Sequence, residues 1–209
     1  MSMISVKDVS LTIGKAKILQ NITIEVEKGS ICGLIGRNGC GKTMLMKCIC
    51  GFILPTSGQI YVNEKQIGVD IEFPENTGIM IETPGFIPEL TGRKNLSILA
   101  GIRHVIGENE IRETMKTVGL DPDSRLSVKK YSLGMRQRLG MAQAIMEKPE
   151  LLILDEPFNS MDKDGVRDIR QNLIDLKKNG TTILITSHVM EDIDILCDKV
   201  YELDKGKLI

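Results

Sequence analysis

The sequence predicts an α/β fold, with a mostly parallel sheet, an N-terminal antiparallel β subdomain and an inserted all-helical subdomain. The first part of the chain carries strand patterns, residues 84–149 carry helical spacing without a clear strand, and strand and helix alternate after that. We therefore expect a single domain of 209 residues. Its α/β core is expected at about residues 1–83 and 150–209, and its helical subdomain at about residues 84–149.

The strand predictions rest on alternating or continuously apolar segments. Residues 4–13 (ISVKDVSLTI) and 21–30 (NITIEVEKGS) alternate between apolar and polar, which is typical of half-buried strands. Further strands are expected at residues 30–35, 57–68, 77–82, 150–157 and 181–187. Residues 199–209 (KVYELDKGKLI) predict a closing hairpin with its turn near residues 205 and 206.

Helices are predicted where apolar residues recur three and four positions apart. These segments are residues 42–50, 96–103, 108–118, 133–146, 164–178 and 190–197. Three of the six fall between residues 84 and 149, so the insert is expected to be all-helical.

Composition narrows the classes of partner. The net charge of −1, the 3% aromatic content and the absence of Trp disfavour nucleic acid as the main ligand. No stretch approaches the about 20 apolar residues that cross a bilayer, so we expect no direct membrane insertion. The five cysteines form no CxxC pair and are expected to be reduced, buried thiols.

Residues 36–43, GRNGCGKT, follow an apolar strand and precede a helix. Glycines in this pattern let successive backbone N–H groups turn inward and cradle phosphate oxygens, in front of a helix N-terminus. Lys42 is expected to reach the β- and γ-phosphates, and the Thr43 hydroxyl to bind Mg²⁺. The predicted nucleotide-binding residues here are Gly36, Asn38, Gly39, Cys40, Gly41, Lys42, Thr43 and Met44.

Two later strands also deliver polar side chains to their carboxyl ends, where ligands bind in open α/β sheets. LLILDEP places Asp155 to hold Mg²⁺ and Glu156 to orient or activate a water. TTILIT leads to His188, a candidate donor to the γ-phosphate. Taken alone, a loop histidine such as His188 is more often an ordinary surface residue, which is our expectation for His104.

Residues 131–145, YSLGMRQRLGMAQAI, resemble the LSGGQ signature of ATP-binding cassette (ABC) proteins. The phosphate loop, this signature, LLILDEP, NSMD at residues 159–162 and His188 follow the order of an ABC ATPase along nearly the whole chain. The resemblance implies a P-loop NTPase (RecA-like) core that binds ATP and Mg²⁺. It also implies that Lys42, Glu156 and His188 are the catalytic residues.

The resemblance further implies an ATP-dependent head-to-tail homodimer. Each ATP would lie between the phosphate loop of one chain and the signature of the other, so Ser132 and Gly134 would bind the partner's nucleotide. Serine is a good N-cap, and a helix N-terminus is an anion site, so the residue types suit this role. A two-fold dimer also explains why one chain carries two γ-phosphate sites.

Two departures from the family pattern concern ATP contacts. Leu133 and Met135 replace residues of the usual signature, which predicts clamping in trans with altered geometry. The aromatic residue that stacks on adenine in many members falls near Ile13, which offers apolar contact without a π-face. We therefore expect loose base selectivity.

A third departure is Glu82, which ends its strand where the family usually has Gln. That position normally lies near the metal and water, so we expect Glu82 to be a third carboxylate beside Asp155 and Glu156, and a metal ligand. The alternative is a solvated Glu at a strand end.

Residues 81–96 and 131–140 resemble ATPase subunits of the bacitracin-resistance and lantibiotic-immunity exporters. This implies separate membrane (permease) subunits, export of a peptide antibiotic or related amphiphile, and a cytoplasmic chain held peripherally on the inner face of the membrane. The apolar turn GFIP, residues 85–88, is the expected contact with a membrane subunit; a local satellite core is the alternative. Members often continue beyond such a hairpin, so the end at Ile209 indicates a short protein or a shortened chain.

Two other functions are compatible with parts of the pattern. A soluble, non-transport ABC ATPase of DNA repair or translation usually carries coiled-coil or zinc insertions, or a second cassette, and we find none of these in the sequence. A nucleotide-sensing module without hydrolysis is expected to lack a Glu at position 156, where this chain has one.

Overall fold

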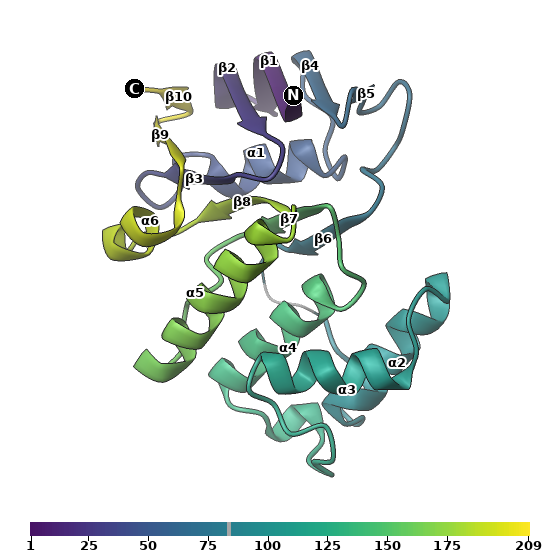
Figure 1. Cartoon of the computed structure of the whole chain (residues 1–209). Coiled ribbons are helices and arrows are strands. Elements are labelled where there is room, and N and C mark those ends of the chain that lie inside the picture. The colour runs from purple at the N-terminus through teal and green to yellow at the C-terminus, as the bar shows by residue number, and fades with distance from the viewer. Residues whose placement is uncertain (83–84) are drawn as a thin grey trace.

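The computed structural model describes residues 1–82 and 85–209, which form two sheets, the helices that pack on them and a helical subdomain at one side (Figure 1). The α/β fold class is therefore confirmed. Residue 84, the predicted start of the helical subdomain, lies outside the described residues.

The N-terminal sheet is antiparallel and has the strand order β2-β1-β4-β5. Its strands are β1 (Ser2–Ile13), β2 (Ala16–Glu27), β4 (Ser57–Val62) and β5 (Lys65–Gln66). Alternate residues of β2 are buried from Ile22 to Val26, as the apolar periodicity predicts, whereas the alternation in β1 shifts by one residue between Val6 and Val9. The sheet is thus half-buried, with one face on the core.

The second sheet has six strands in the order β10-β9-β3-β8-β7-β6. They are β3 (Ile31–Ile35), β6 (Thr77–Met80), β7 (Leu151–Leu154), β8 (Thr182–Thr186), β9 (Lys199–Asp204) and β10 (Lys207–Leu208). Neighbours from β9 to β6 are parallel, and β10 closes the edge as the predicted antiparallel hairpin. Because β3, β8 and β7 lie side by side, their carboxyl ends share one edge of the sheet.

Helices cover both faces of this sheet. Figure 1 shows α1 (Lys42–Ile49) between the two sheets, with α5 (Lys163–Lys178) and α6 (Met190–Leu196) on the other side. Buried residues of α1 join one apolar cluster with the antiparallel strands. Those of α5 and α6 join a second cluster, which continues into the helical subdomain.

The helical subdomain contains α2 (Gly92–Arg103), α3 (Glu108–Thr117), a short 3-10 turn at Val128–Lys130 and α4 (Leu133–Ile145). Helix α2 starts four residues earlier than residue 96, because the Thr91 hydroxyl accepts a hydrogen bond from the Lys94 N–H and caps the helix. The 3-10 turn was not expected from the sequence. Helix α4 packs on β6 and joins the subdomain to the core.

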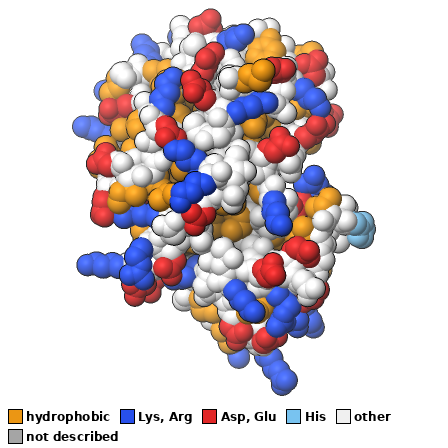
Figure 2. Space-filling model, viewed as in Figure 1, with side chains coloured by type: hydrophobic (Ala, Val, Ile, Leu, Met, Phe, Trp, Pro, Cys, Tyr) orange, Lys and Arg blue, Asp and Glu red, His pale blue; other side chains and the backbone are white. Residues whose placement is uncertain are grey.

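Within residues 1–82 and 85–209, none of the helices has the length and apolar content that a bilayer span requires. Acidic and basic side chains are interspersed over the face seen in Figure 2, in keeping with the net charge of −1.

Candidate nucleotide site

The phosphate loop joins β3 to α1 and has a backbone that glycine alone adopts easily. Gly36, Gly39 and Gly41 have φ angles of 139°, 79° and 116°. A Cβ at Gly36 would lie 2.1 Å from the carbonyl oxygen of Leu203, so this position is also too tight for any side chain. The turn predicted from the glycines is therefore present.

A pocket of about 390 Å³ opens above this loop at the carboxyl edge of the sheet. Its lining residues are Ile18, Asn38, Gly39, Gly41, Lys42, Thr43, Met44, Asp155 and Glu156. Cys40 is buried in the loop beneath, where Gly36 leaves room for its sulfur.

Ile13 is not among the lining residues. It ends β1 opposite Ala16 and is 50% exposed, whereas Ile18 of β2 reaches the pocket. Ile18 was missed in the sequence because strand pairing, rather than chain position, brings it beside the loop.

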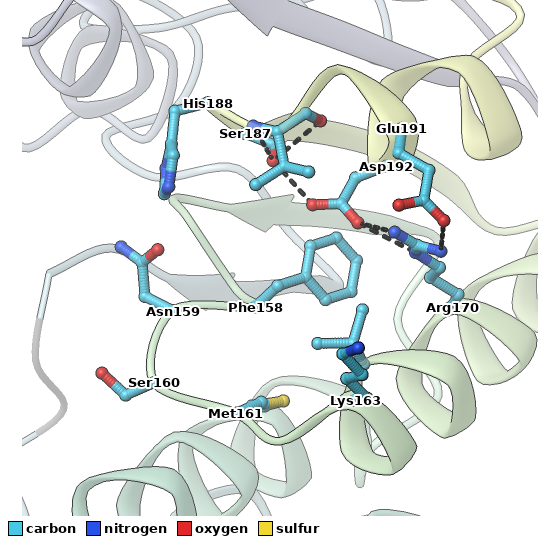
Figure 3. Close-up of a pocket in the computed structure, with 12 residues that line it drawn as sticks. Phe158, Asn159, Ser160, Met161, Lys163, Arg170, Ser187, His188, Glu191 and Asp192 are labelled. Atoms are coloured by element: carbon cyan, nitrogen blue, oxygen red, sulfur yellow. Dashed lines mark hydrogen bonds and ion pairs between the residues drawn. The ribbon is translucent and has the colours of Figure 1, made fainter.

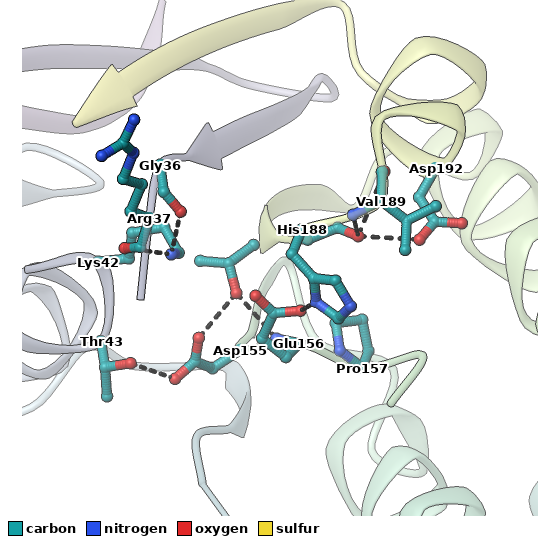
Figure 4. A network of polar contacts seen from close by, with 12 residues as sticks. Gly36, Arg37, Lys42, Thr43, Asp155, Glu156, Pro157, His188, Val189 and Asp192 are labelled. Atoms are coloured by element: carbon teal, nitrogen blue, oxygen red, sulfur yellow. Dashed lines mark hydrogen bonds and ion pairs between the residues drawn. The ribbon is translucent and has the colours of Figure 1, made fainter. Parts of the chain in front are cut away.

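The ammonium group of Lys42 lies inside the loop. It donates hydrogen bonds to the carbonyl oxygens of Gly36 and Arg37, at 2.7 and 3.3 Å (Figure 4). The residue is only 6% exposed, so its positive charge is held inside the loop. This arrangement attracts a polyanion.

Asp155 connects the loop to the neighbouring strands. Its two carboxylate oxygens accept hydrogen bonds from the Thr43 hydroxyl, at 2.6 Å, and from the Thr186 hydroxyl, at 2.7 Å. The side chain of Asp155 is thereby fixed over the start of α1 (Figure 4). Thr186 carries no motif in the sequence, and only its place on β8 reveals its contact with Asp155.

Glu156 and His188 meet at the same edge. The His188 Nδ1 lies 2.8 Å from the Glu156 Oε2. Glu156 has a φ angle of 50°, and a non-glycine residue in this region costs about 1–3 kcal/mol. The Thr186 hydroxyl accepts from the Glu156 N–H, and the Gln137 side chain donates to the Glu156 carbonyl.

Glu82 has a different partner from the one the sequence led us to expect. Its carboxylate pairs with the Lys47 ammonium at 2.6 Å and is mostly exposed. Among residues 1–82 and 85–209, no group of three or more His, Cys, Asp and Glu side chains is close enough to hold a metal ion. A third carboxylate beside Asp155 and Glu156 is therefore not what the structure shows, because the basic residue on α1 draws Glu82 aside.

Ser132 and Gly134 lie at the start of α4, apart from the residues that line the phosphate-loop pocket. The Ser132 hydroxyl caps the helix by accepting from the Met135 N–H at 3.1 Å. Both Ser132 and Leu133 are exposed. The helix N-terminus thus faces solvent and is available to a second molecule.

A larger pocket, of about 540 Å³, is lined by α5, α6 and the segments at residues 158–161 and 187–189, so His188 lines this pocket and not the one above the phosphate loop (Figure 3). On its wall the Arg170 Nε donates to Asp192 at 2.8 Å, and Asp192 accepts from the Ser187 hydroxyl at 2.8 Å. Ser187 in turn accepts from the Val189 N–H. These contacts, centred on the buried Ser187 and Asp192, fix the loop that carries His188.

A glycine-rich loop with an enclosed lysine, followed by a threonine that contacts a strand-end aspartate, defines a P-loop protein that binds nucleoside triphosphates. The sequence profile of the family described as "ABC transporter" matches residues 19–159. The chain belongs to this family, as its motifs predicted.

Relatives extend the likeness over the whole chain. An uncharacterized ABC transporter ATP-binding protein, YybJ of Bacillus subtilis, is 44% identical over 99% of this chain and 94% of its own length. The bacitracin transport ATP-binding protein BcrA of Enterococcus faecalis is 42% identical over 94% of this chain and 64% of its own length. The lantibiotic transport ATP-binding protein SrtF of Streptococcus pyogenes is 34% identical over 99% of this chain and 89% of its own length.

Solved structures agree on the fold. A structure described as the ATP-binding subunit of an ABC transporter has a TM-score of 0.88 at 26% identity, over 99% of this chain and 88% of that chain. The dimeric structure of MJ0796, a bacterial ABC transporter cassette, has a TM-score of 0.89 at 20% identity, over 99% and 96% of the two chains.

Proposed function

We propose that this chain binds and hydrolyses ATP to power an exporter of a peptide antibiotic or a related amphiphile, through separate membrane subunits. The observation that carries hydrolysis is the pair of Glu156 and His188, 2.8 Å apart beside the phosphate loop. The names of the bacitracin and lantibiotic relatives support the cargo class. They also leave a soluble ATPase of DNA repair or translation without support.

The residues at the loop fit Mg²⁺. Thr43 and Asp155 offer only oxygen donors, and these already lie 2.6 Å apart. One carboxylate and one hydroxyl suit Mg²⁺, which keeps several waters and shares the nucleotide's phosphates as ligands. When bound, the ion neutralises charge on the phosphate oxygens. Glu82 takes no part in this proposal, because Lys47 holds it.

Each catalytic residue has a role that follows from its position. Lys42 offsets negative charge on the β- and γ-phosphates from inside the loop. Glu156 accepts a hydrogen bond from the attacking water and orients it. His188 lines the neighbouring larger pocket and contacts the phosphate-loop pocket through its hydrogen bond with Glu156, and from there it would stabilise charge on the γ-phosphate.

The second γ-phosphate contact comes from another copy of the chain. The exposed N-terminus of α4, with Ser132 as its cap, lies outside the pocket of its own chain, so it serves the nucleotide of a partner in a head-to-tail dimer. Closure of this dimer on ATP and its opening after hydrolysis would move the helical subdomain. Through that subdomain the chain would act on membrane subunits from the inner face of the membrane.

The test is Mg²⁺-ATP turnover against protein concentration, with dimerisation followed by light scattering. Specific activity is expected to rise with concentration in the wild type. Glu156→Gln is expected to abolish turnover and to accumulate an ATP-bound dimer. Glu150→Gln, at the other end of the same strand and exposed, is the matched control and is expected to behave as the wild type.

Two results would contradict the proposal. Turnover retained in Glu156→Gln would remove the assigned role of that carboxylate. Absence of turnover in the wild type, repeated with the membrane subunits present, would reduce the chain to a nucleotide-binding module.

A further inference from the structure

We propose that Gln137 and Thr186 are positioning residues that hold Glu156 in the backbone conformation needed for hydrolysis. The inference rests on the proposed function, because it assigns the parts that keep the catalytic carboxylate in place. We call Gln137 and Thr186 the Glu156 clamp.

The need for a clamp follows from strand geometry. Asp155 and Glu156 are consecutive, and consecutive side chains of an extended chain point to opposite faces. Both carboxylates nevertheless line the same pocket. The chain achieves this by leaving the extended conformation at Glu156, whose φ angle is 50°. A non-glycine residue stays in this region only when its surroundings impose it.

Thr186 holds the backbone of Glu156 in this conformation from the amino side. Its hydroxyl donates to the Asp155 Oδ1 at 2.7 Å and accepts from the Glu156 N–H at 2.8 Å. The side chain is fully buried on β8, so the hydroxyl has little freedom to turn elsewhere. One hydroxyl thereby fixes the carboxylate of one residue relative to the backbone of the next.

Gln137 holds the backbone of Glu156 in the same conformation from the carboxyl side. Its Nε2 donates to the carbonyl oxygens of Glu156 and Pro157, at 3.1 and 3.2 Å. An amide NH₂ group has two hydrogens, so both bonds form at once. The peptide groups on either side of the Glu156 side chain are thus held by two different elements, β8 and α4.

The position of Gln137 adds a link between the two ATP sites of the dimer. Gln137 lies on α4, the helix that Ser132 caps and whose N-terminus serves the partner's nucleotide. A shift of this helix on binding the partner's ATP changes the hold on Glu156 in its own site.

The test compares Gln137→Leu with Gln143→Leu, a control on the same helix that is also half-buried. Gln137→Leu is expected to lower kcat about 10- to 100-fold, because a small misplacement of a catalytic group costs that much. The KM for ATP and the affinity for a fluorescent ATP analogue are expected to stay unchanged, since the phosphate loop is untouched. Gln143→Leu is expected to keep the wild-type kcat.

Thr186 is tested with a second matched pair. Thr182 lies on the same strand, is fully buried and accepts a backbone N–H from Gly29, but it touches neither carboxylate. Thr186→Val is expected to lower kcat, Thr186→Ser to restore it, and Thr182→Val to change only the melting temperature.

Hydrogen exchange of the peptide spanning residues 154–160 provides a readout that needs no turnover. Faster exchange is expected in Gln137→Leu and Thr186→Val and not in the controls. Unchanged exchange in Gln137→Leu and Thr186→Val would overturn the clamp. If the wild type is active, an unchanged kcat in both variants would overturn it as well. An inactive wild type would instead count against the proposed function, while the exchange result still decides the clamp.

Discussion

The hydroxyl of Thr43 donates a 2.6 Å hydrogen bond to the carboxylate of Asp155, across 112 positions of sequence. The contact joins the phosphate loop on α1 to the carboxyl end of β7. It brings the two proposed Mg²⁺ ligands together before nucleotide arrives, so little reorganisation is needed on binding.

Removal of this hydroxyl is expected to damage metal use. Mutation of a residue that only hydrogen-bonds to a metal ligand typically costs about 10- to 100-fold in activity. Thr43→Val removes a proposed ligand itself, so it should lower Mg²⁺-ATP turnover by more than that. It should also raise the Mg²⁺ concentration at half-maximal rate. Thr43→Ser keeps the hydroxyl and is expected to restore both values. A magnesium titration of turnover checks this, and an unchanged titration in Thr43→Val would remove Thr43 from the metal site.

The head-to-tail arrangement predicts complementation between two inactive variants. Lys42→Ala removes the cation of the phosphate loop, and Ser132→Arg places a bulky side chain at the exposed start of α4. In a mixed dimer one of the two ATP sites keeps both parts intact. On random pairing, about half of the dimers are mixed and each mixed dimer has one intact site. An equimolar mixture is therefore expected to recover turnover, up to about a quarter of the wild-type rate if the sites are independent. Mixtures as inactive as each variant alone would argue against sharing of sites.

Two apolar side chains of the turn at residues 85–88 have different surroundings. Phe86 is partly buried against the helical core, which favours the satellite-core alternative for that side chain. Ile87 is 46% exposed, and its backbone is held by Asn95, which accepts from its N–H at 2.7 Å. Ile87→Asp is thus expected to uncouple export from ATP turnover in reconstituted vesicles without loss of stability. Phe86→Asp should instead lower the melting temperature, and normal export by Ile87→Asp would exclude this contact.

Two glycine-to-alanine changes are expected to have opposite effects on stability. A Cβ at Gly78 on β6 would lie 1.9 Å from the Ala144 carbonyl oxygen on α4, so one backbone must move, at a cost of about 1–3 kcal/mol or more. A Cβ at Gly101 on α2 meets nothing within 4 Å, and alanine there gains about 1 kcal/mol from helix propensity. Urea unfolding of both variants measures the two signs. A neutral Gly78→Ala would show that the helical subdomain is not tightly packed on the core.

The buried thiols are expected to make the free energy of unfolding fall as pH rises into the alkaline range. Burial raises the pKa of the Cys50 thiol to about 12 from its usual 9.0, with a smaller contribution from the neighbouring Cys48 thiol. Because the folded pKa is the higher one, this stability is complete below about pH 9 and is lost as pH rises toward about 12. Between these values the wild type should lose about 1.4 kcal/mol per pH unit more than Cys50→Ala. Urea unfolding of both proteins at pH 8 and pH 10 measures this. The prediction is wrong if the difference in unfolding free energy between the wild type and Cys50→Ala is the same at the two pH values.

The sequence by itself determined the α/β architecture, the all-helical insert and the order of the functional motifs. Spacing of apolar residues and the needs of a phosphate-binding turn are local properties, so residues 36–43 and the segment LLILDEP could be interpreted without coordinates. The match of the family profile to residues 19–159 shows the family that the order of these motifs predicted.

Only the tertiary structure decided which side chains from distant segments meet. Ile18 rather than Ile13 lines the pocket, because the pairing of β1 with β2 sets which residue faces it. Glu82 turns to Lys47, because an ion pair between neighbouring elements competes with a metal site that the strand pattern alone suggests. Thr186 and Gln137 contact Glu156 because β8 pairs with β7 and α4 packs on β6, and packing between elements leaves no pattern in a single sequence.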